Sequence, residues 1–114
     1  MDNFRNLIVS KRSVGIATEI YIMTSDFPNS ELYGLTSQIR RSTVSISSNI
    51  AESAGRKSKK EFAKFLGIAY GSACELETQL LISMNLKFLK TNEFEVLFED
   101  IIEIQKMLYA LEKK

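Results

Sequence analysis

Residues 33–81 decide the fold, and they read YGLTSQIRRSTVSISSNIAESAGRKSKKEFAKFLGIAYGSACELETQLL. The stretch holds two long patterns of apolar residues at helical spacing. Between them lies a basic corner, which we define as residues 55–60, Gly-Arg-Lys-Ser-Lys-Lys. A glycine followed by a serine is typical of a helix end and a new helix start. We therefore predict two helices joined by a short basic turn, with both ends of the chain packed against them as further helices.

The composition favours one soluble helical domain. The chain has 114 residues with one proline and five glycines, which is long enough to bury a core without disulfides or metals. Cys74 is the single cysteine, so no intrachain disulfide can form and we expect a reducing, cytoplasmic location. The N-terminal residues lack the pattern of a secretory signal, and no apolar run has the length of a membrane span. We expect one domain, residues 1–114, with no membrane partner.

Apolar periodicity predicts four helices, with Phe27-Pro28-Asn29-Ser30 stopping the first. Four helices with short connections form an all-α fold, which we predict to be an antiparallel up-and-down four-helix bundle. The expected boundaries are about residues 3–25, 35–55, 59–88 and 93–112.

Three helix ends carry recognisable signals. Gly55 is placed to end the second helix in the left-handed conformation. Ser58 with Glu61 three residues later matches a capping box that starts the third helix, and Asn92 with Glu95 matches one for the fourth.

The first predicted helix is apolar on two sides. The wider side comprises Phe4, Leu7, Ile8, Val14, Ala17, Tyr21 and Ile22, and a second row comprises Ile16, Ile20 and Met23. This is broader than the stripe of an ordinary surface helix, so we expect burial on both sides.

A polar row follows the second predicted helix at heptad spacing. It is either the solvated side of the helix or a hydrogen-bonding seam whose small side chains let another helix approach. The third helix carries an apolar core row and, beside it, the small residues Ala63, Gly67, Gly71 and Cys74. Cys74 is interpreted as a small buried residue, because no histidine exists to activate its thiol. The residues proposed for an oligomer or helix-packing seam are Gln38, Ser45, Asn49, Glu52, Gly67 and Gly71.

Charge is distributed unevenly behind a net charge of +1. Residues 40–64 contain seven cations and two acids, whereas residues 75–103 contain seven acids and two lysines. One half of the folded domain should therefore be basic and the other acidic.

The absence of histidine removes most catalytic hypotheses. It excludes Glu-x-x-His metal sites and Ser-His or Cys-His nucleophile systems. Neither Gly67 nor Gly55 belongs to a loop with phosphate-cradle spacing. We therefore expect a non-enzymatic protein without a cofactor or a metal site.

The basic corner is the remaining candidate site. It surrounds the start of the third helix, where free N–H groups and the helix dipole favour anions. It is either a contact for nucleic-acid backbone or a solubilising loop neutralised by neighbouring acids. Recognition would depend on charge and shape and would be sensitive to salt. The candidate nucleic-acid-binding residues are Arg40, Arg41, Arg56, Lys57, Lys59, Lys60 and Lys64.

Several motifs resemble the bacterial four-helix bundle family of 23S rRNA intervening sequence proteins. They are residues 33–41 (YGLTSQIRR), 45–52 (SISSNIAE), 55–62 (GRKSKKEF), 65–66 (FL), 71–72 (GS) and 75–80 (ELETQL). Ser53 departs from the glycine that the family usually has at this point, and the N-terminal segment lacks the family's Trp-Gln pair.

The resemblance implies a homopentamer of bundles. A related group, the accessory variability determinants of diversity-generating retroelements, binds nucleic acid and a reverse transcriptase. We expect a self-assembling bundle that binds RNA or DNA backbone, with a partner of the reverse-transcriptase kind. The alternatives are a protein-interaction scaffold that binds no nucleic acid, and a ligand pocket within the bundle or at the centre of the ring.

Overall fold

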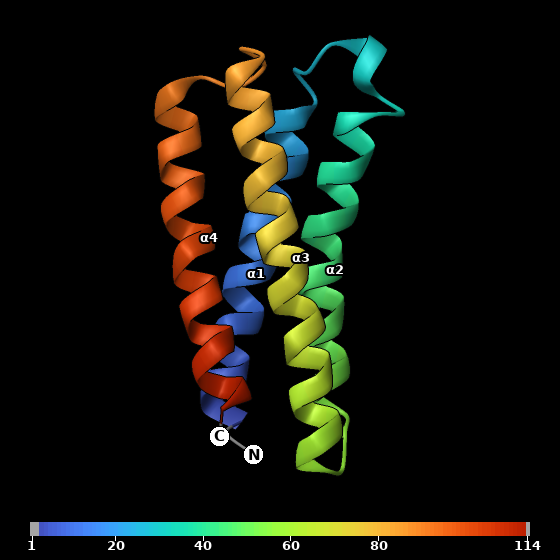
Figure 1. The fold of residues 1–114 in the computed structure, drawn as a ribbon, viewed down its shortest axis with the longest axis vertical. Coiled ribbons are helices and arrows are strands. Elements are labelled where there is room, and N and C mark those ends of the chain that lie inside the picture. Colours follow the sequence, from blue (N-terminus) through green and yellow to red (C-terminus); the bar gives the residue numbers. More distant parts are fainter. Residues whose placement is uncertain (1–2, 114) are drawn as a thin grey trace.

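The computed structural model describes residues 3–113, and this part of the chain is helical almost throughout. The helices agree with the predicted boundaries to within three residues, so the all-α fold with four helices is confirmed (Figure 1). The elements are α1 (Asn3–Thr24), the short 3₁₀ helix η1 (Asn29–Glu31), α2 (Leu35–Ala54), α3 (Lys59–Asn85) and α4 (Thr91–Glu112).

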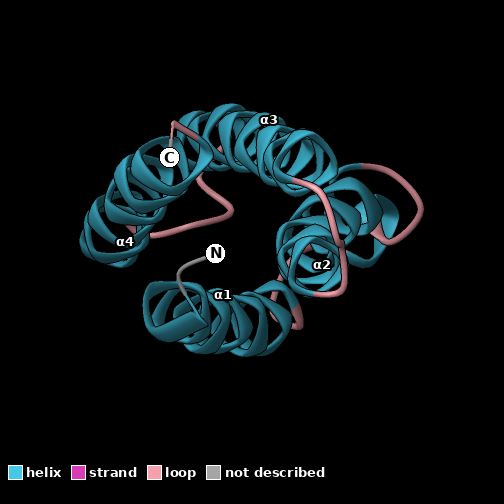
Figure 2. Ribbon diagram, turned by 90° about the horizontal axis from the view of Figure 1, so that it is seen from below, coloured by secondary structure: helices cyan, strands magenta, loops and turns pink. Residues whose placement is uncertain are grey.

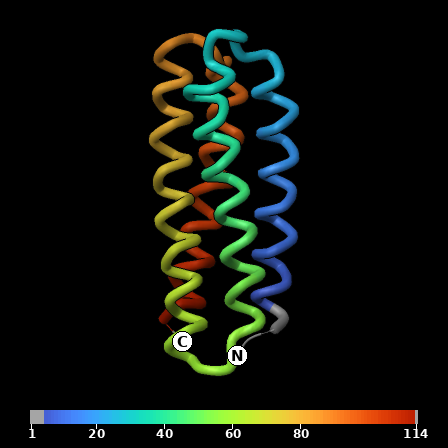
Figure 3. The backbone as a smooth tube through the Cα atoms, turned by 90° about the vertical axis from the view of Figure 1, so that its right-hand side faces the viewer, coloured from blue at the N-terminus to red at the C-terminus, as the bar shows by residue number. Residues whose placement is uncertain are grey.

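The four helices lie side by side along one long axis (Figures 1 and 3). The molecule measures 43 × 25 × 18 Å. Viewed along the axis, the helices follow one another in chain order around the bundle (Figure 2). α2 and α3 pack most extensively, and α1 and α4 pack least. The α2–α3 turn, the start of α1 and the end of α4 share one end of the bundle, called the lower end here, and the other two connections lie at the upper end.

The core is an aliphatic centre to which all four helices contribute. Full burial of one such side chain stabilises a fold by about 1.5–3 kcal/mol, so this centre is the main source of stability. The apolar row predicted for α3 is buried, except that Phe65 is half-buried. The largest fully buried apolar side chains are Val9, Ile20, Ile39, Ile46, Ile50, Leu66, Leu76, Leu80, Ile101, Ile104 and Leu108.

α1 buries only one of its two apolar sides within the chain. Ile16 and Ile20 from the second row reach the core, whereas the wider row faces outward, with Val14 53% and Ile22 68% exposed. Three polar residues of α1, Asn6, Ser13 and Thr24, are buried instead. Phe4 is outside the residues whose side chains are described.

Hydrogen bonds to α2 explain why α1 buries polar residues. Asn6 Nδ2 donates to Ser53 Oγ at 3.3 Å, and Ser47 Oγ donates to Ser13 Oγ at 3.1 Å. Ser53 also donates to the Ile50 carbonyl at 2.6 Å. A glycine at position 53, as the family usually has, would lack the hydroxyl that makes both bonds. The serine that replaces this glycine here is therefore matched by Asn6, its hydrogen-bond partner on α1.

The end of α2 differs from the prediction. Gly55 has φ −87° and ψ 0°, so the expected left-handed conformation is wrong. Its N–H bonds to the Glu52 carbonyl at 3.2 Å, and the helix closes in a tightened right-handed turn. At the start of α3, Ser58 Oγ accepts from the Glu61 N–H at 3.1 Å, as predicted.

The left-handed residue lies at the end of α3 instead. Lys87 has φ 64°, Phe88 N–H donates to the Ser83 carbonyl at 2.9 Å, and Lys87 N–H donates to the Met84 carbonyl at 2.9 Å. This pair of bonds is a Schellman motif, and it ends α3 at Asn85, earlier than residue 88.

The start of α4 was also predicted in the wrong place. The helix begins at Thr91, and the Glu93 carboxylate accepts from the Lys90 N–H at 3.2 Å. Glu93 therefore provides the cap that we assigned to Glu95, because the chain re-enters the helical conformation directly after Leu89 and Lys90.

Candidate nucleic-acid interface

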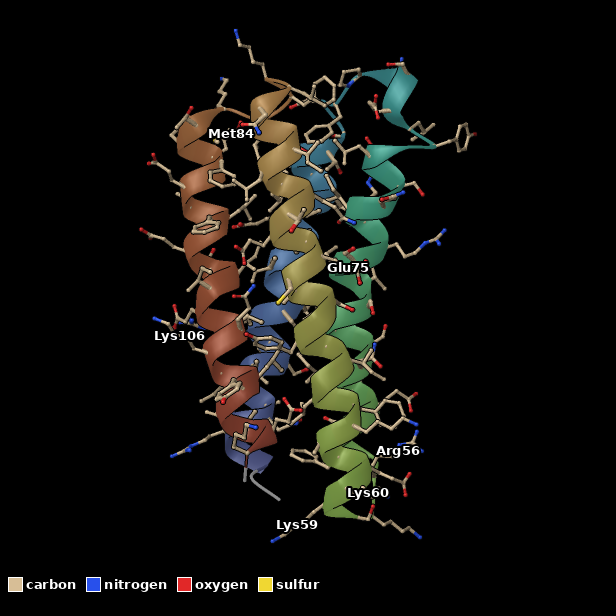
Figure 4. All side chains as sticks on the ribbon, in the orientation of Figure 1. Arg56, Lys59, Lys60, Glu75, Met84 and Lys106 are labelled. Carbon is tan, nitrogen blue, oxygen red and sulfur yellow. The ribbon has the colours of Figure 1, made fainter. Side chains whose placement is uncertain are left out.

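The basic corner forms the tip of the lower end. The corner begins at Gly55, directly after α2, and α3 begins within it at Lys59. Its cations therefore come from one tight turn and the first turn of a helix. In Figure 4, Lys59 and Lys60 point away from the bundle at this tip, and Arg56 lies beside the lower part of α3. The local structure therefore gathers the positive charges instead of spreading them along the bundle.

Arg56 is held by its neighbours. Its guanidinium pairs with the Glu52 carboxylate one turn earlier and lies 3.9 Å from the Glu61 carboxylate. Its Nε donates to the Glu52 carbonyl at 3.2 Å, and its Cζ lies 4.7 Å from the centre of the Phe65 ring. Neutralisation by neighbouring acids, one of the two alternatives for the corner, therefore applies to Arg56. The two carboxylates that flank the corner, Glu52 and Glu61, both lie close to this one guanidinium.

The lysines are arranged differently. Lys57, Lys59 and Lys60 are exposed, and no carboxylate within the described residues pairs with them. Lys64 is also exposed, and its Nζ lies 5.8 Å from the centre of the Phe65 ring. The corner thus offers three lysine ammonium groups to a partner and Lys64 adds a fourth beside it, while the arginine of the corner is engaged internally.

Arg40 and Arg41 do not join the corner. At 1.5 Å per residue, Arg41 lies about 22 Å along α2 from Arg56. Arg40 is half-buried: its Nε donates to Thr24 Oγ1 at 2.9 Å and its guanidinium lies over the Tyr21 ring at 4.7 Å. Arg40 therefore joins α2 to α1, whereas Arg41 is exposed.

The predicted seam residues of α2 have different environments. The hydroxyls of Ser45 and Ser72 share a hydrogen bond of 2.8 Å across the α2–α3 contact. Asn49 Nδ2 donates to the Ser45 carbonyl at 2.8 Å. Gln38 is exposed, and Glu52 is exposed beside Arg56. Small hydroxyl side chains thus lie where α2 and α3 pack most closely.

The two glycines of the seam differ, because Gly67 approaches a side chain of α4 closely and Gly71 approaches no other helix within the described chain. A Cβ added to Gly71 would meet no atom within 4 Å, and one added to Gly67 would lie 3.1 Å from the Glu112 carboxylate. Gly71 is on the exposed side of α3.

Cys74 was predicted to be buried, and this is wrong: it is exposed one turn beyond Gly71 on the same outer side. Its pKa is raised, first by partial desolvation and then by the negative charge of Glu77. A thiol with a raised pKa holds less of the reactive thiolate at neutral pH.

Two kinds of site are missing from residues 3–113. No cluster of three or more potential metal ligands occurs in this part of the chain. None of its helices combines the length and apolar character that a bilayer crossing requires.

Sequence reasoning missed the outward-facing apolar side of α1 as a surface feature. Leu7, Val14 and Tyr21 recur every seven residues, and all three are exposed. The signal was present as two apolar rows, of which the wider contains these three residues, but periodicity alone does not say which row faces the core.

Comparisons with known proteins agree with this architecture. The family model described as "23S rRNA-intervening sequence protein" matches residues 5–110. Among solved structures, the chain is similar to a protein of unknown function from the S23 ribosomal protein family of Bacteroides thetaiotaomicron VPI-5482, with a TM-score of 0.89 and 27% identity over 96% of this chain and 99% of that one. No curated protein matches. The chain belongs to the 23S rRNA-intervening sequence protein family.

Proposed function

We propose that this protein is a non-enzymatic bundle that binds the backbone of RNA or DNA through the lysines of the basic corner. The observation that carries the proposal is that Lys57, Lys59 and Lys60 are exposed without a carboxylate partner among residues 3–113, while the arginine between them and α2 is paired. Unpaired ammonium groups release counterions when they contact phosphates, which supplies sequence-independent affinity. Lys64 extends the same surface by one helical turn.

Binding of this kind does not read bases. Phe62, two residues after the corner, is buried, and Phe65 is half-buried and covered by Arg56 and Lys64. Among the described side chains the most exposed aromatic residue is Tyr33 at 93%, in the connection from η1 to α2. None of the described aromatic rings therefore offers the corner lysines a stacking platform, and discrimination among sequences should be weak. Arg41 would make a second contact only with a strand that lies along α2 for about 22 Å, or six to seven base pairs.

We also propose that antiparallel up-and-down bundles of this chain assemble as a homopentamer. The family resemblance suggests this number, and the exposed apolar side of α1 supports self-association. A hollow of about 400 Å³ between α1 and α2 is lined by Val14, Ala17, Tyr21, Ile22 and Val44 together with two hydroxyl residues. Apolar surface of this kind is typical of contacts between subunits. Light scattering tests the assembly, and a clean monomer at micromolar concentration would contradict it.

Cellular location and partners follow the same reasoning. We propose a cytoplasmic protein whose basic surface binds nucleic acid independently of its sequence. Such a protein could serve a nucleic-acid-processing partner such as a reverse transcriptase, as the resemblance implies. The rival function is a scaffold that binds proteins and no nucleic acid. The exposed apolar residues of α1 support this rival as much as they support self-association.

A binding experiment separates the two functions. In the test variant Lys57, Lys59 and Lys60 are all changed to Glu, and in the matched control the exposed lysines Lys11, Lys90 and Lys106 are changed instead. Both variants carry the same net charge. We expect the first to lose RNA and DNA binding and the second to bind nearly as the unchanged protein does. Equal losses would reduce the effect to net charge, and no loss in either variant would show that the corner lysines do not bind nucleic acid. Absence of binding by the unchanged protein would leave the scaffold as the function.

A further inference from the structure

α1 and α4 form the most open side of the bundle. Two hollows follow each other along their contact and share Glu19. The upper hollow has a volume of about 410 Å³ and the lower about 270 Å³. Both are distinct from the apolar hollow between α1 and α2, although Ile22 lines that hollow and the upper one. We call the two together the α1–α4 groove.

Apolar side chains from both helices line the upper part of the groove. Met23 and Leu97 lie nearest the core, and Ile22 and Val96 are 68% and 59% exposed. The lower part lies against Ile16. Ile22, Val96 and the partly buried Met23 therefore form an accessible apolar strip on facing helices, lined also by the buried Leu97, and apolar side chains of another helix can fill it.

Acids border this strip. Glu19, Asp26 and Glu93 line the upper hollow, and Asp100 lines the lower one. The cation among the groove-lining residues is Arg12, whose guanidinium is paired with the Glu103 carboxylate. Lys87 and Lys90 line a cavity at the upper end of the bundle that shares Met23, Asp26 and Glu93 with the upper hollow. The upper hollow is therefore an apolar strip bordered by acids, and the acidic border continues through Glu19 to Asp100 in the lower hollow, beside the paired Arg12.

We propose that the α1–α4 groove binds a basic amphipathic helix of a partner protein. Charge complementarity decides the occupant, since lysine or arginine on both flanks of an apolar helix face would meet Glu19, Asp26, Glu93 and Asp100. The groove runs from Arg12 to Asp26 along α1, about 21 Å, which accommodates roughly 14 residues of a docked helix. The inference does not rest on nucleic-acid binding, because the basic corner lies on other helices at the lower end.

The probe is a fluorescent helical peptide of about 14 residues with leucines at positions i, i+4, i+7 and i+11 and lysines beside them. A peptide of the same composition in scrambled order is the control. Anisotropy is measured with the assembled protein at about 50 mM and about 200 mM salt. We expect saturable binding of the patterned peptide that weakens with salt, and no comparable binding of the scrambled peptide.

Three variants locate the site. Changing Glu19 and Asp26 to Lys should weaken binding about tenfold, because two attractive contacts become repulsive. The matched double change of Glu75 and Glu99 to Lys, both exposed outside the groove, should alter the affinity less than about twofold. Val96→Glu makes the groove more acidic but interrupts its apolar strip, so we expect weaker binding.

Each contrary result overturns the proposal. If Val96→Glu strengthens binding, the peptide is held by charge alone and the groove does not recognise its apolar face. Equal losses in the two double variants would lead to the same conclusion. If the Glu19 and Asp26 variant changes the mass of the assembly while the peptide fails to bind the unchanged protein, the groove belongs to a second copy of this chain. Nucleic-acid binding should be unaffected by Val96→Glu, so failure here would leave the basic corner untouched.

Discussion

Changing Arg56 to Gln should lower stability and leave nucleic-acid affinity almost intact, although Arg56 lies in the middle of the basic corner. The side chain makes its contacts within the chain: it pairs with Glu52 and covers the Phe65 ring. An exposed ion pair at this helical spacing contributes about 0.3–0.5 kcal/mol, and a guanidinium over an aromatic ring about 0.5–1 kcal/mol. The free energy of unfolding should therefore fall by about 1 kcal/mol, which corresponds to a Tm lower by about 4 °C for a chain of this length.

Lys60→Gln is the matched comparison, since Lys60 has no carboxylate partner within the described residues. Its Tm should stay within about 1 °C of the unchanged protein, because a surface substitution without contacts has little effect on stability. Its nucleic-acid affinity should fall. Thermal denaturation and salt-titrated binding of the two variants in one buffer provide the measurements. If Arg56→Gln melts at the unchanged temperature and loses as much affinity as Lys60→Gln, the division of the corner into an internal arginine and free lysines is wrong.

Three further predictions concern single positions. Lys87→Gly should raise Tm by about 2–4 °C, because glycine adopts the left-handed conformation of this position without strain, whereas Lys90→Gly, at φ −71°, should lower Tm. Equal effects of the two changes on Tm in thermal denaturation would refute the backbone argument. Gly71→Ala should stabilise the isolated chain by up to about 1 kcal/mol, and Gly67→Ala by less because Glu112 must move; chemical denaturation that ranks them in the opposite order would contradict this. Cys74 should react with iodoacetamide more slowly than an unstructured cysteine near pH 8 because its pKa is raised, and a faster rate would contradict the desolvation and the effect of the Glu77 charge.

The helices were predictable because their signals are local. Ser58 fixes the start of α3 through its own hydroxyl, and the apolar row from Phe62 to Leu80 specifies one face of one helix. The ends of α2 and α3 were less predictable. Gly55 permits a left-handed turn without requiring it, while Lys87 adopts one despite its side chain because the two Schellman bonds hold it there.

The orientation of α1 could not be predicted, since its sequence carries two apolar rows. Ser13 and Asn6 are buried because Ser47 and Ser53 lie opposite them on α2. Such pairs depend on the register between helices, which no local pattern contains. The burial of Cys74 was predicted wrongly for a related reason. Small residues occur both in buried helix contacts and on exposed helix sides, so their pattern does not distinguish the two.

The candidate site was only partly predictable. Charge clustering in the sequence located the corner, but it treated all seven cations alike. The fold separates them into a paired arginine, an arginine that links α1 and α2, an exposed arginine, and lysines that pair with no carboxylate of the described residues. That distinction depends on Phe65 and Thr24, which reach the arginines only in the folded chain, and on Glu52, whose i,i+4 spacing from Arg56 is already present in the sequence.

The central claim is that free lysines at one helix corner contact phosphates. The most direct test is the slope of log affinity against log salt concentration for a duplex, measured for the unchanged protein and for the variant with Lys57, Lys59 and Lys60 changed to Gln. Each lost phosphate contact reduces the magnitude of the slope by about 0.9, so removal of three contacts should reduce it by about 2.7. An identical slope and affinity in the two proteins would show that these lysines do not contact nucleic acid.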